Sequence, residues 1–298
     1  MANVDVATLQ DIAREGRVQI LRMLTHAGSG HPGGSLSVID ILVTLYFHRL
    51  RYDPKRPDWE DRDRFILSKG HCVPAQYFCM ARAGFFPMQW LTTLRKLGSP
   101  LQGHPDRVML PGIEAATGSL GQGLSISVGM ALGLKLAAKN ARVYCVIGDG
   151  ESQEGQVWET AMSAPGLGAP NHHVDNLCTI LDYNGIQLDD FVKKIVDLEP
   201  LADKWRSFGW PVIEIDGHDF AQIDKALDQA ESNKGRPTFI IAHTVKGKGV
   251  SFMENDPEWH GKAPKPAEAI RGIREVVGDP PPPWAAAIIA ELEALEKK

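Results

Sequence analysis

The chain has 298 residues, with 32 lysines and arginines against 37 aspartates and glutamates, so its formal net charge is −5. Hydrophobic residues make up 43% and charged residues 23%, an ordinary globular composition that excludes disorder for the bulk of the chain. Because the balance is acidic and no long lysine or arginine run occurs, nucleic acid is not expected to be the main partner.

Apolar runs alternate with stretches of helical spacing along the chain. The strand runs are nearly continuous in apolar and β-branched residues, which is typical of a sheet covered on both faces. In chain order we expect a helix at 37–50, strands at 64–68, 142–148, 177–183 and 212–216, helices at 117–138 (between the first two strands) and 221–232, and a last strand at 238–243. This alternation predicts an α/β fold, a doubly wound and mainly parallel sheet with helices on both faces.

Residues 1–279 are expected to form one domain, since a single core grows to about 250–300 residues. The four prolines at 280–283 predict a stiff spacer, and residues 284–298 a short C-terminal helix. Residues 164–175, APGLGAPNHHVD, are too rich in proline and glycine for regular structure and are expected to be a loop.

The cysteines and the lack of targeting signals in the sequence indicate the expected cellular compartment. No CxxC pair occurs, so we expect small core residues of a reduced protein at Cys72, Cys79, Cys145 and Cys178. The first residues lack the basic start and apolar stretch of a signal peptide, and no window approaches the roughly 18 apolar residues of a membrane span. A cytoplasmic protein without a membrane partner is therefore expected.

The segment GDGESQEG, residues 148–155, follows directly after a predicted strand. Ligands of parallel α/β sheets bind beyond the carboxyl ends of the strands, where Asp149 and the following helix would meet a cation and a phosphate. The next strand ends in DYNG, which brings Asn184 to the same edge. This oxygen set suits Mg²⁺ or Ca²⁺ held together with phosphate oxygens. The alternative is a pair of strand-end turns in which Asp149 and Asn184 only cap helices.

Four histidines, each beside a glycine, are candidates for chemistry. Imidazole can donate to phosphate and move protons on hydroxyl groups near neutral pH. The segments are GSGHPGG, SKGHCVPA, LQGHPD and EWHGKAP, which contain His31, His71, His104 and His260. A single histidine is more often structural, which we expect of His48, His218 and His243, whereas His172 and His173 are expected in a solvated loop. The spacing excludes the usual zinc motifs.

Two further glycine-rich segments each allow both a ligand-binding and a purely structural interpretation. ATGSLGQG, residues 116–123, is neither a dinucleotide fingerprint nor a P-loop, and a glycine-lined helix entry is the simpler interpretation. HTVKGKG, residues 243–249, is a basic loop after the last strand in which Lys246 could hold a diphosphate, or could be solvated.

Taken together, these segments resemble transketolase, a thiamine diphosphate enzyme. SGHPGGSLS (29–37), SKGH (68–71), GHP (103–105), TGSLGQG (117–123), GDGESQEG (148–155), NGI (184–186) and WHGKAP (259–264) stand in that family's order over most of the chain. The resemblance implies transfer of a two-carbon ketol unit from a ketose to an aldose, with thiamine diphosphate and Mg²⁺, for which Ca²⁺ could substitute.

The resemblance also implies particular roles. Asp149, Asn184 and the Ile186 carbonyl would hold the metal, and Gly118 and Leu120 would offer backbone groups to the aminopyrimidine. The diphosphate side of the cofactor would contact His71, Gly150, Asn184, Lys246 and His260. His31, His104 and His260 would face substrate hydroxyls. Glu154 would link cofactor sites across a subunit interface. The alternative is that Glu154 only stabilises the start of a helix, where an acidic residue is favourable.

The chain matches only the first of the three transketolase domains. We therefore expect half an active site, completed by a separate chain with the pyrimidine and C-terminal domains, in a heterotetramer acting on sugar phosphates. The sugar is left open, and a sulfonated or branched sugar is equally compatible. The alternatives are the alpha chain of a 2-oxo-acid dehydrogenase, against which the GH segments speak, and a non-catalytic cofactor-binding subunit.

Overall fold

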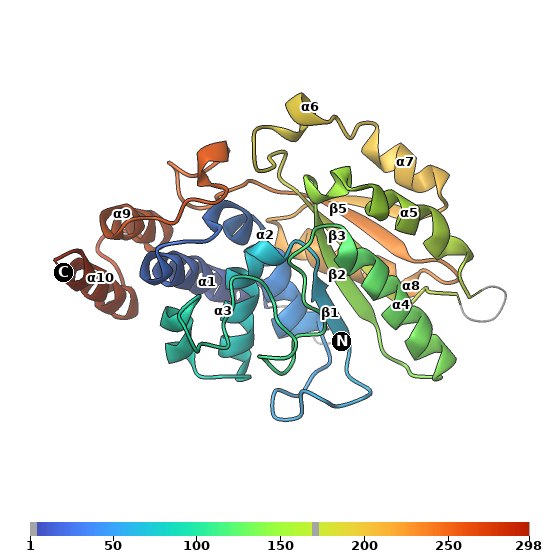
Figure 1. Cartoon of the computed structure of the whole chain (residues 1–298), viewed down its shortest axis with the longest axis horizontal. Helices are drawn as coiled ribbons and strands as arrows, with labels where there is room; N and C mark the ends of the chain where they lie inside the picture. Colours follow the sequence, from blue (N-terminus) through green and yellow to red (C-terminus); the bar gives the residue numbers. More distant parts are fainter. Residues whose placement is uncertain (1–4, 169–172, 298) are drawn as a thin grey trace.

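The computed structural model describes residues 5–168 and 173–297, and its strands closely match the five predicted apolar runs. Within these residues a single sheet of five parallel strands has the order β1-β2-β3-β5-β4 (Figure 1). The strands are β1 (Arg64–Leu67), β2 (Val143–Gly148), β3 (Leu177–Tyr183), β4 (Val212–Asp216) and β5 (Thr238–His243). The predicted α/β fold with a parallel sheet is confirmed.

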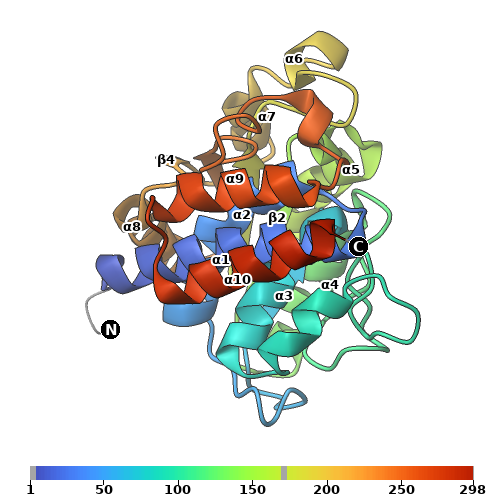
Figure 2. The same cartoon turned by 90° about the vertical axis from the view of Figure 1, so that its left-hand side faces the viewer.

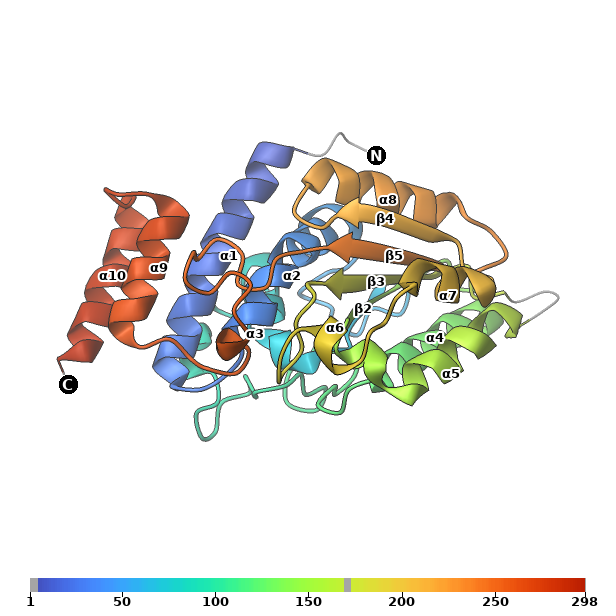
Figure 3. The ribbon, with the colours of Figure 1, turned by 90° about the horizontal axis from the view of Figure 1, so that it is seen from above.

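Helices cover both faces of this sheet. The helices of the described residues are α1 (Val6–Ala27), α2 (Pro32–Thr44), α3 (Val73–Ala83), α4 (Gln122–Leu136), α5 (Gly155–Ser163), α6 (Val192–Ile195), α7 (Leu201–Ser207), α8 (Phe220–Ser232), α9 (Pro266–Val277) and α10 (Pro283–Glu296). The hydrophobic core on one face of the sheet contains residues of α4, α5 and α7, and the core on the other face contains residues of α1, α2 and α8. Seen from above, α8 and α4 lie at opposite sides of the sheet (Figure 3).

Side chains of each strand alternate between two hydrophobic cores. On β2, Tyr144 and Val146 pack with the helices α1, α2, α3 and α8. Val143, Cys145 and Ile147 pack instead with α4, α5 and α7. All five side chains are buried, which explains why the strand is apolar without interruption: successive residues point to opposite faces, and neither face meets water.

The N-terminal ends of two helices differ from the predicted ones. The helix predicted at 37–50 begins earlier, at Pro32, because proline suits the first helical position; it ends at Thr44, and a π-helical turn (Leu45–Arg49) follows. The helix predicted at 117–138 begins only at Gln122, after Gly121 with φ 82°, so residues 117–121 form a loop. Both differences lie next to the cavity described below.

The C-terminal segment is part of the larger core. The predicted terminal helix is present as α10, which packs beside α9 and α1 (Figure 2). Ile288, Ile289 and Leu292 are buried there, and the Glu291 carboxylate accepts hydrogen bonds from the Arg22 guanidinium at 3.0 and 2.6 Å. The prolines at 280–283 thus lead directly into a helix that is docked on the domain.

The predicted loop at 164–175 begins with a 3-10 turn, Ala164–Gly166, while residues 169–172, including His172, lie outside the described residues. All four cysteines are buried and unpaired, as expected. In the described parts of the chain, no helix is both long and apolar enough to cross a membrane.

Candidate active site

Two strand ends create the centre of the site. Gly148 at the end of β2 lies beside Asp182 of β3, so the turns that follow the two strands are neighbours. The Asp149 carboxylate accepts a hydrogen bond from the Gly150 N–H at 2.7 Å and another from the Gly185 N–H. Asn184 Oδ1 accepts from the Ile186 N–H at 3.2 Å. The parallel register therefore brings the aspartate and the asparagine together, as the sequence predicts.

The four glycine-flanked histidines gather at the same edge, although they come from distant segments. His31 precedes α2, His71 lies in a 3-10 turn after β1 (Gly70–Cys72), His104 lies in a loop, and His260 follows a 3-10 turn (Pro257–Trp259). The ring centroid of His31 is 5.1 Å from that of His71, 5.3 Å from that of His260 and 6.3 Å from that of His104. Nδ1 of His31 is buried without a hydrogen-bond partner among the described residues.

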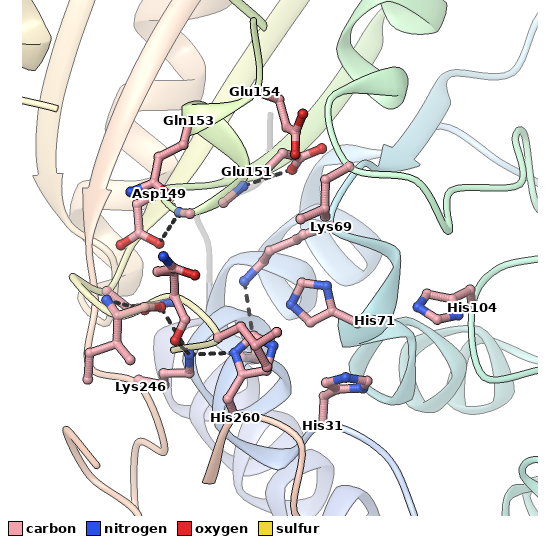
Figure 4. Close-up of a pocket in the computed structure, with 18 of the residues that line it drawn as sticks. His31, Lys69, His71, His104, Asp149, Glu151, Gln153, Glu154, Lys246 and His260 are labelled. Atoms are coloured by element: carbon pink, nitrogen blue, oxygen red, sulfur yellow. Dashed lines mark hydrogen bonds between the residues drawn. The ribbon is translucent and has the colours of Figure 1, made fainter. Parts of the chain in front are cut away.

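Every predicted site residue lines one cavity of about 400 Å³. In Figure 4 the acidic side chains of Asp149, Glu151 and Glu154 lie across this cavity from the His31 and His260 rings. Glu154 is the N-cap residue of α5 and is exposed at the edge of the cavity. The predicted residues that the structure brings together are His31, His71, His104, Gly118, Leu120, Asp149, Gly150, Glu154, Asn184, Ile186, Lys246 and His260.

Lys246 points into the cavity from the basic loop after β5. Its ammonium donates to the Ile186 carbonyl at 2.9 Å and to His260 Nδ1 at 2.8 Å. The side chain is buried rather than solvated, and burial lowers its pKa. The solvated alternative for this lysine is wrong.

A polar network outside the cavity holds the Lys246 loop. The Arg17 guanidinium donates to both Asp40 carboxylate oxygens at 3.0 and 2.6 Å, and its Nε donates to the Lys248 carbonyl. His218 Nδ1 lies 2.7 Å from Asp40 Oδ2, and its Nε2 accepts from the Val245 N–H at 2.9 Å. Because Nε2 accepts, the proton must be on Nδ1. His218 is thus a satisfied structural histidine, as expected, and it braces the loop next to Lys246.

The histidines of the cavity are neutral at pH 7. Burial, together with Arg95, His104 and Lys246, lowers the pKa of His31 to about 4. Burial, together with the Lys246 charge, lowers the pKa of His260 to about 3, and burial also lowers the pKa of His71 and His104. Neutral imidazoles can accept a proton or a hydrogen bond, which imidazolium ions cannot.

Two important charged residues were not predicted from the sequence. Lys69, which belongs to the same SKGH segment as His71, lines the cavity and forms a buried ion pair with Asp182. The Glu151 carboxylate accepts from the Gly121 N–H at 2.8 Å and the Gly148 N–H at 3.0 Å, which ties the glycine-rich loop to the β2 end. Burial raises the pKa of Glu151. The remaining unpredicted lining residues are Gly34, Gly148, Gln153, Gln187 and Leu188.

The donor set fits a diphosphate bound with a hard divalent cation. No group of three or more His, Cys, Asp and Glu side chains suited to a metal occurs in the described residues, so a zinc-type site is not formed there. Asp149, Asn184 and Ile186 line the cavity instead. Their carboxylate, amide and carbonyl oxygens are of the hard type that suits Mg²⁺ when phosphate completes the shell. A Cβ on Gly118 would meet no atom closer than His104 Cγ at 3.9 Å, so a flat ring can approach this backbone.

Comparisons with known proteins agree with this geometry. Residues 8–294 match the family model for the thiamine diphosphate-binding domain of transketolase. The chain is 45% identical over 250 residues to the 6-deoxy-6-sulfo-D-fructose transketolase subunit SqwG of Clostridium sp. (strain MSTE9), covering 82% of this chain and 89% of that protein. It is 37% identical over 273 residues to an apulose-4-phosphate transketolase subunit of Phocaeicola vulgatus, covering 92% of this chain and 95% of that protein.

A solved structure, the transketolase from Leishmania mexicana, superposes with a TM-score of 0.86 at 29% identity, covering 97% of this chain. The chain spans 45% of the length of that transketolase. The fold and the site thus define a thiamine diphosphate-binding module of the α/β class. The chain belongs to the transketolase family, and within it the chain is a transketolase-type enzyme subunit.

Proposed function

We propose that this chain is the N-terminal, diphosphate-binding subunit of a two-chain transketolase. It would transfer a two-carbon ketol unit from a ketose phosphate to an aldose phosphate with thiamine diphosphate and Mg²⁺. The observation that carries this proposal is the single cavity lined by every residue that the family pattern nominates.

The chain's own residues would hold the cofactor at its charged end. The metal would be bound by Asp149, Asn184 and the Ile186 carbonyl, and Ca²⁺ could substitute for Mg²⁺. His71, Gly150, Asn184, Lys246 and His260 would contact the diphosphate side, and the backbone at Gly118 and Leu120 the aminopyrimidine. When bound, thiamine diphosphate supplies a nucleophilic carbon and an electron sink for cleaving the bond beside the ketose carbonyl.

The histidines would handle protons on the sugar. His31, His104 and His260 are neutral, so each can accept a hydrogen bond or a proton from a substrate hydroxyl while the carbon–carbon bond breaks or forms. Lys246 bonds to His260 Nδ1, which leaves Nε2 of that ring for the substrate or cofactor. Glu154, at the exposed edge of the cavity, is the residue proposed to meet a neighbouring protomer.

A separate partner chain is part of the proposal. The relatives that match over most of their length are named as transketolase subunits, which supports a partner with the pyrimidine and C-terminal domains, in a heterotetramer. Their names also support an acidic or branched sugar, a sulfofructose or apulose 4-phosphate, alongside xylulose 5-phosphate. The four buried, unpaired cysteines support a cytoplasmic location.

The test is ketol transfer from xylulose 5-phosphate to ribose 5-phosphate, with thiamine diphosphate and Mg²⁺, by this chain alone and by the chain co-expressed with its candidate partner. We expect turnover only in the pair, and its loss in D149A but not in D203A, a change to an exposed carboxylate on α7. Turnover by the purified chain alone would contradict the two-chain proposal. No turnover by the pair with these or the sulfonated and branched sugars would contradict the transferase activity.

A further inference from the structure

The side chain of one arginine next to the His31 and His104 loops has no polar partner among the described residues. Arg95 follows the 3-10 helix Met88–Thr93, and its backbone N–H donates to the Leu101 carbonyl at 2.9 Å. Its φ is 59°, a left-handed conformation that side chains disfavour. In residues 5–168 and 173–297, its exposed guanidinium makes no hydrogen bond or ion pair. Arg62, in contrast, forms an ion pair with Glu114.

The Arg95 side chain packs against the two loops that present the substrate-facing histidines. A Cβ on Gly103, which precedes His104, would lie 2.7 Å from Arg95 Nε and 2.8 Å from Cζ. A Cβ on Gly30, which precedes His31, would lie 3.9 Å from the same Nε. Because Gly103 has no side chain, the Arg95 guanidinium can lie beside both His31 and His104 without a clash.

No acid in residues 5–168 and 173–297 forms an ion pair with Arg95. Asp106, the nearest acid in sequence, uses its carboxylate to accept from the Val108 and Met109 N–H groups at 2.8 and 3.2 Å. The neighbouring histidine rings are neutral at pH 7, and the cations that line the cavity itself are Lys69 and Lys246. Within the part of the chain that the structure describes, a positive charge without an ion-pair partner therefore stands beside His31 and His104.

We propose that Arg95 binds the acidic group of the sugar substrate, a phosphate or a sulfonate, so that this chain contributes its own anion-recognition residue to the site. The inference rests on the proposed function, because it takes the cavity beside His31 and His104 as the sugar site. Guanidinium offers paired donors whose spacing matches two oxygens of a phosphate or sulfonate. An uncharged sugar would gain little from it.

The experiment uses the assembled two-chain enzyme with R95M, R95K and the control K96M, which removes the exposed cation next in the chain. Donors are xylulose 5-phosphate, 6-deoxy-6-sulfofructose and uncharged erythrulose. R95M should raise KM for the acidic donors about 10- to 100-fold, as expected for loss of a charged hydrogen bond, with kcat and the erythrulose kinetics little changed. R95K should recover part of the loss, and K96M should behave as wild type.

An equal KM change for acidic and uncharged donors would overturn the proposal, as would a shift confined to the pH profile of kcat, which would mean that Arg95 acts on the histidines. Equilibrium binding of ribose 5-phosphate and of ribose, measured by calorimetry, decides the matter without turnover. If the wild-type enzyme binds both equally, or R95M keeps the preference for the phosphate, Arg95 does not recognise the anion, whether or not the enzyme has transferase activity.

Discussion

Removal of the Lys69 ammonium should test the buried charges beneath the cavity. Lys69 and Asp182 form an ion pair whose side chains are 3% and 0% exposed. The carboxylate also accepts from the Ser37 and Thr244 hydroxyls. Burial by itself would raise the pKa of Asp182, but the Lys69 charge and these hydrogen bonds lower it, so Asp182 is ionised in the folded protein.

Lys69→Met keeps the length of the side chain and leaves the Asp182 charge buried without its cation. Removal of one partner from a buried pair costs about 3–5 kcal/mol, whereas exposed pairs contribute about 0–1 kcal/mol. We therefore expect K69M to lower the free energy of unfolding by about 3–5 kcal/mol. The control R14M breaks the exposed Arg14–Asp11 pair on α1 and should change it far less.

Urea unfolding of the full chain, followed by tryptophan fluorescence, measures both changes, since Trp205 and Trp210 are buried in one of the two cores. The double variant K69M/D182N removes both charges. Its loss of unfolding free energy should therefore be smaller than the sum of the losses in K69M and in D182N. A K69M chain within about 1 kcal/mol of wild type would show that the Asp182 charge is compensated in some other way, and would refute the reasoning.

Two further changes are predicted. G70A should severely destabilise the chain, because the new Cβ would lie 1.6 Å from the Thr117 carbonyl oxygen. The control G129A in α4, where a new Cβ has no atom within 4 Å, should be neutral or stabilising by about 0.5–1 kcal/mol. Equal melting temperatures of G70A and G129A would contradict this prediction. E291Q should lower stability at pH 7 by at most about 1 kcal/mol. Burial raises the Glu291 pKa, but Arg22 lowers it, so that the pKa lies below 4.5 overall. The ion pair therefore stabilises the folded chain at neutral pH, and this contribution is lost as the pH falls through the lowered pKa. In thermal unfolding, the difference between E291Q and wild type should therefore shrink as the pH falls below 4.5, and a difference that stays constant as the pH falls would contradict the assignment.

The sheet could be predicted from the sequence almost residue by residue. The runs at 177–183, 212–216 and 238–243 coincide with β3, β4 and β5, because strands buried on both faces leave long apolar segments. Helices are harder to predict. The sequence pattern starts α4 at residue 117 instead of Gln122, since a glycine-rich loop and a glycine-rich helix have the same composition. The long helix α1 was not predicted, although Asp5 caps its start and Gly28 its end.

The site was predictable where a motif coincides with a strand end. Asp149 and Asn184 follow two adjacent parallel strands, β2 and β3. The fold and the sequence motif therefore both predict that these residues lie at the carboxyl edge of the sheet. The role of Lys69 could not be predicted in this way, because its partner Asp182 lies 113 residues further along the chain. Arg95 carried no sequence signal, since its position depends on the folding of three separate loops.

The proposed function requires that this chain hold the diphosphate end of thiamine diphosphate through a metal bound by Asp149 and Asn184. Calorimetric titration of thiamine diphosphate into the two-chain enzyme tests it most directly, for wild type and D149N, with Mg²⁺ and with a chelator. We predict binding that requires Mg²⁺, that is much weaker for thiamine without its diphosphate, and that D149N abolishes. Equal binding of thiamine and thiamine diphosphate, independent of Mg²⁺ and unchanged in D149N, would contradict the account.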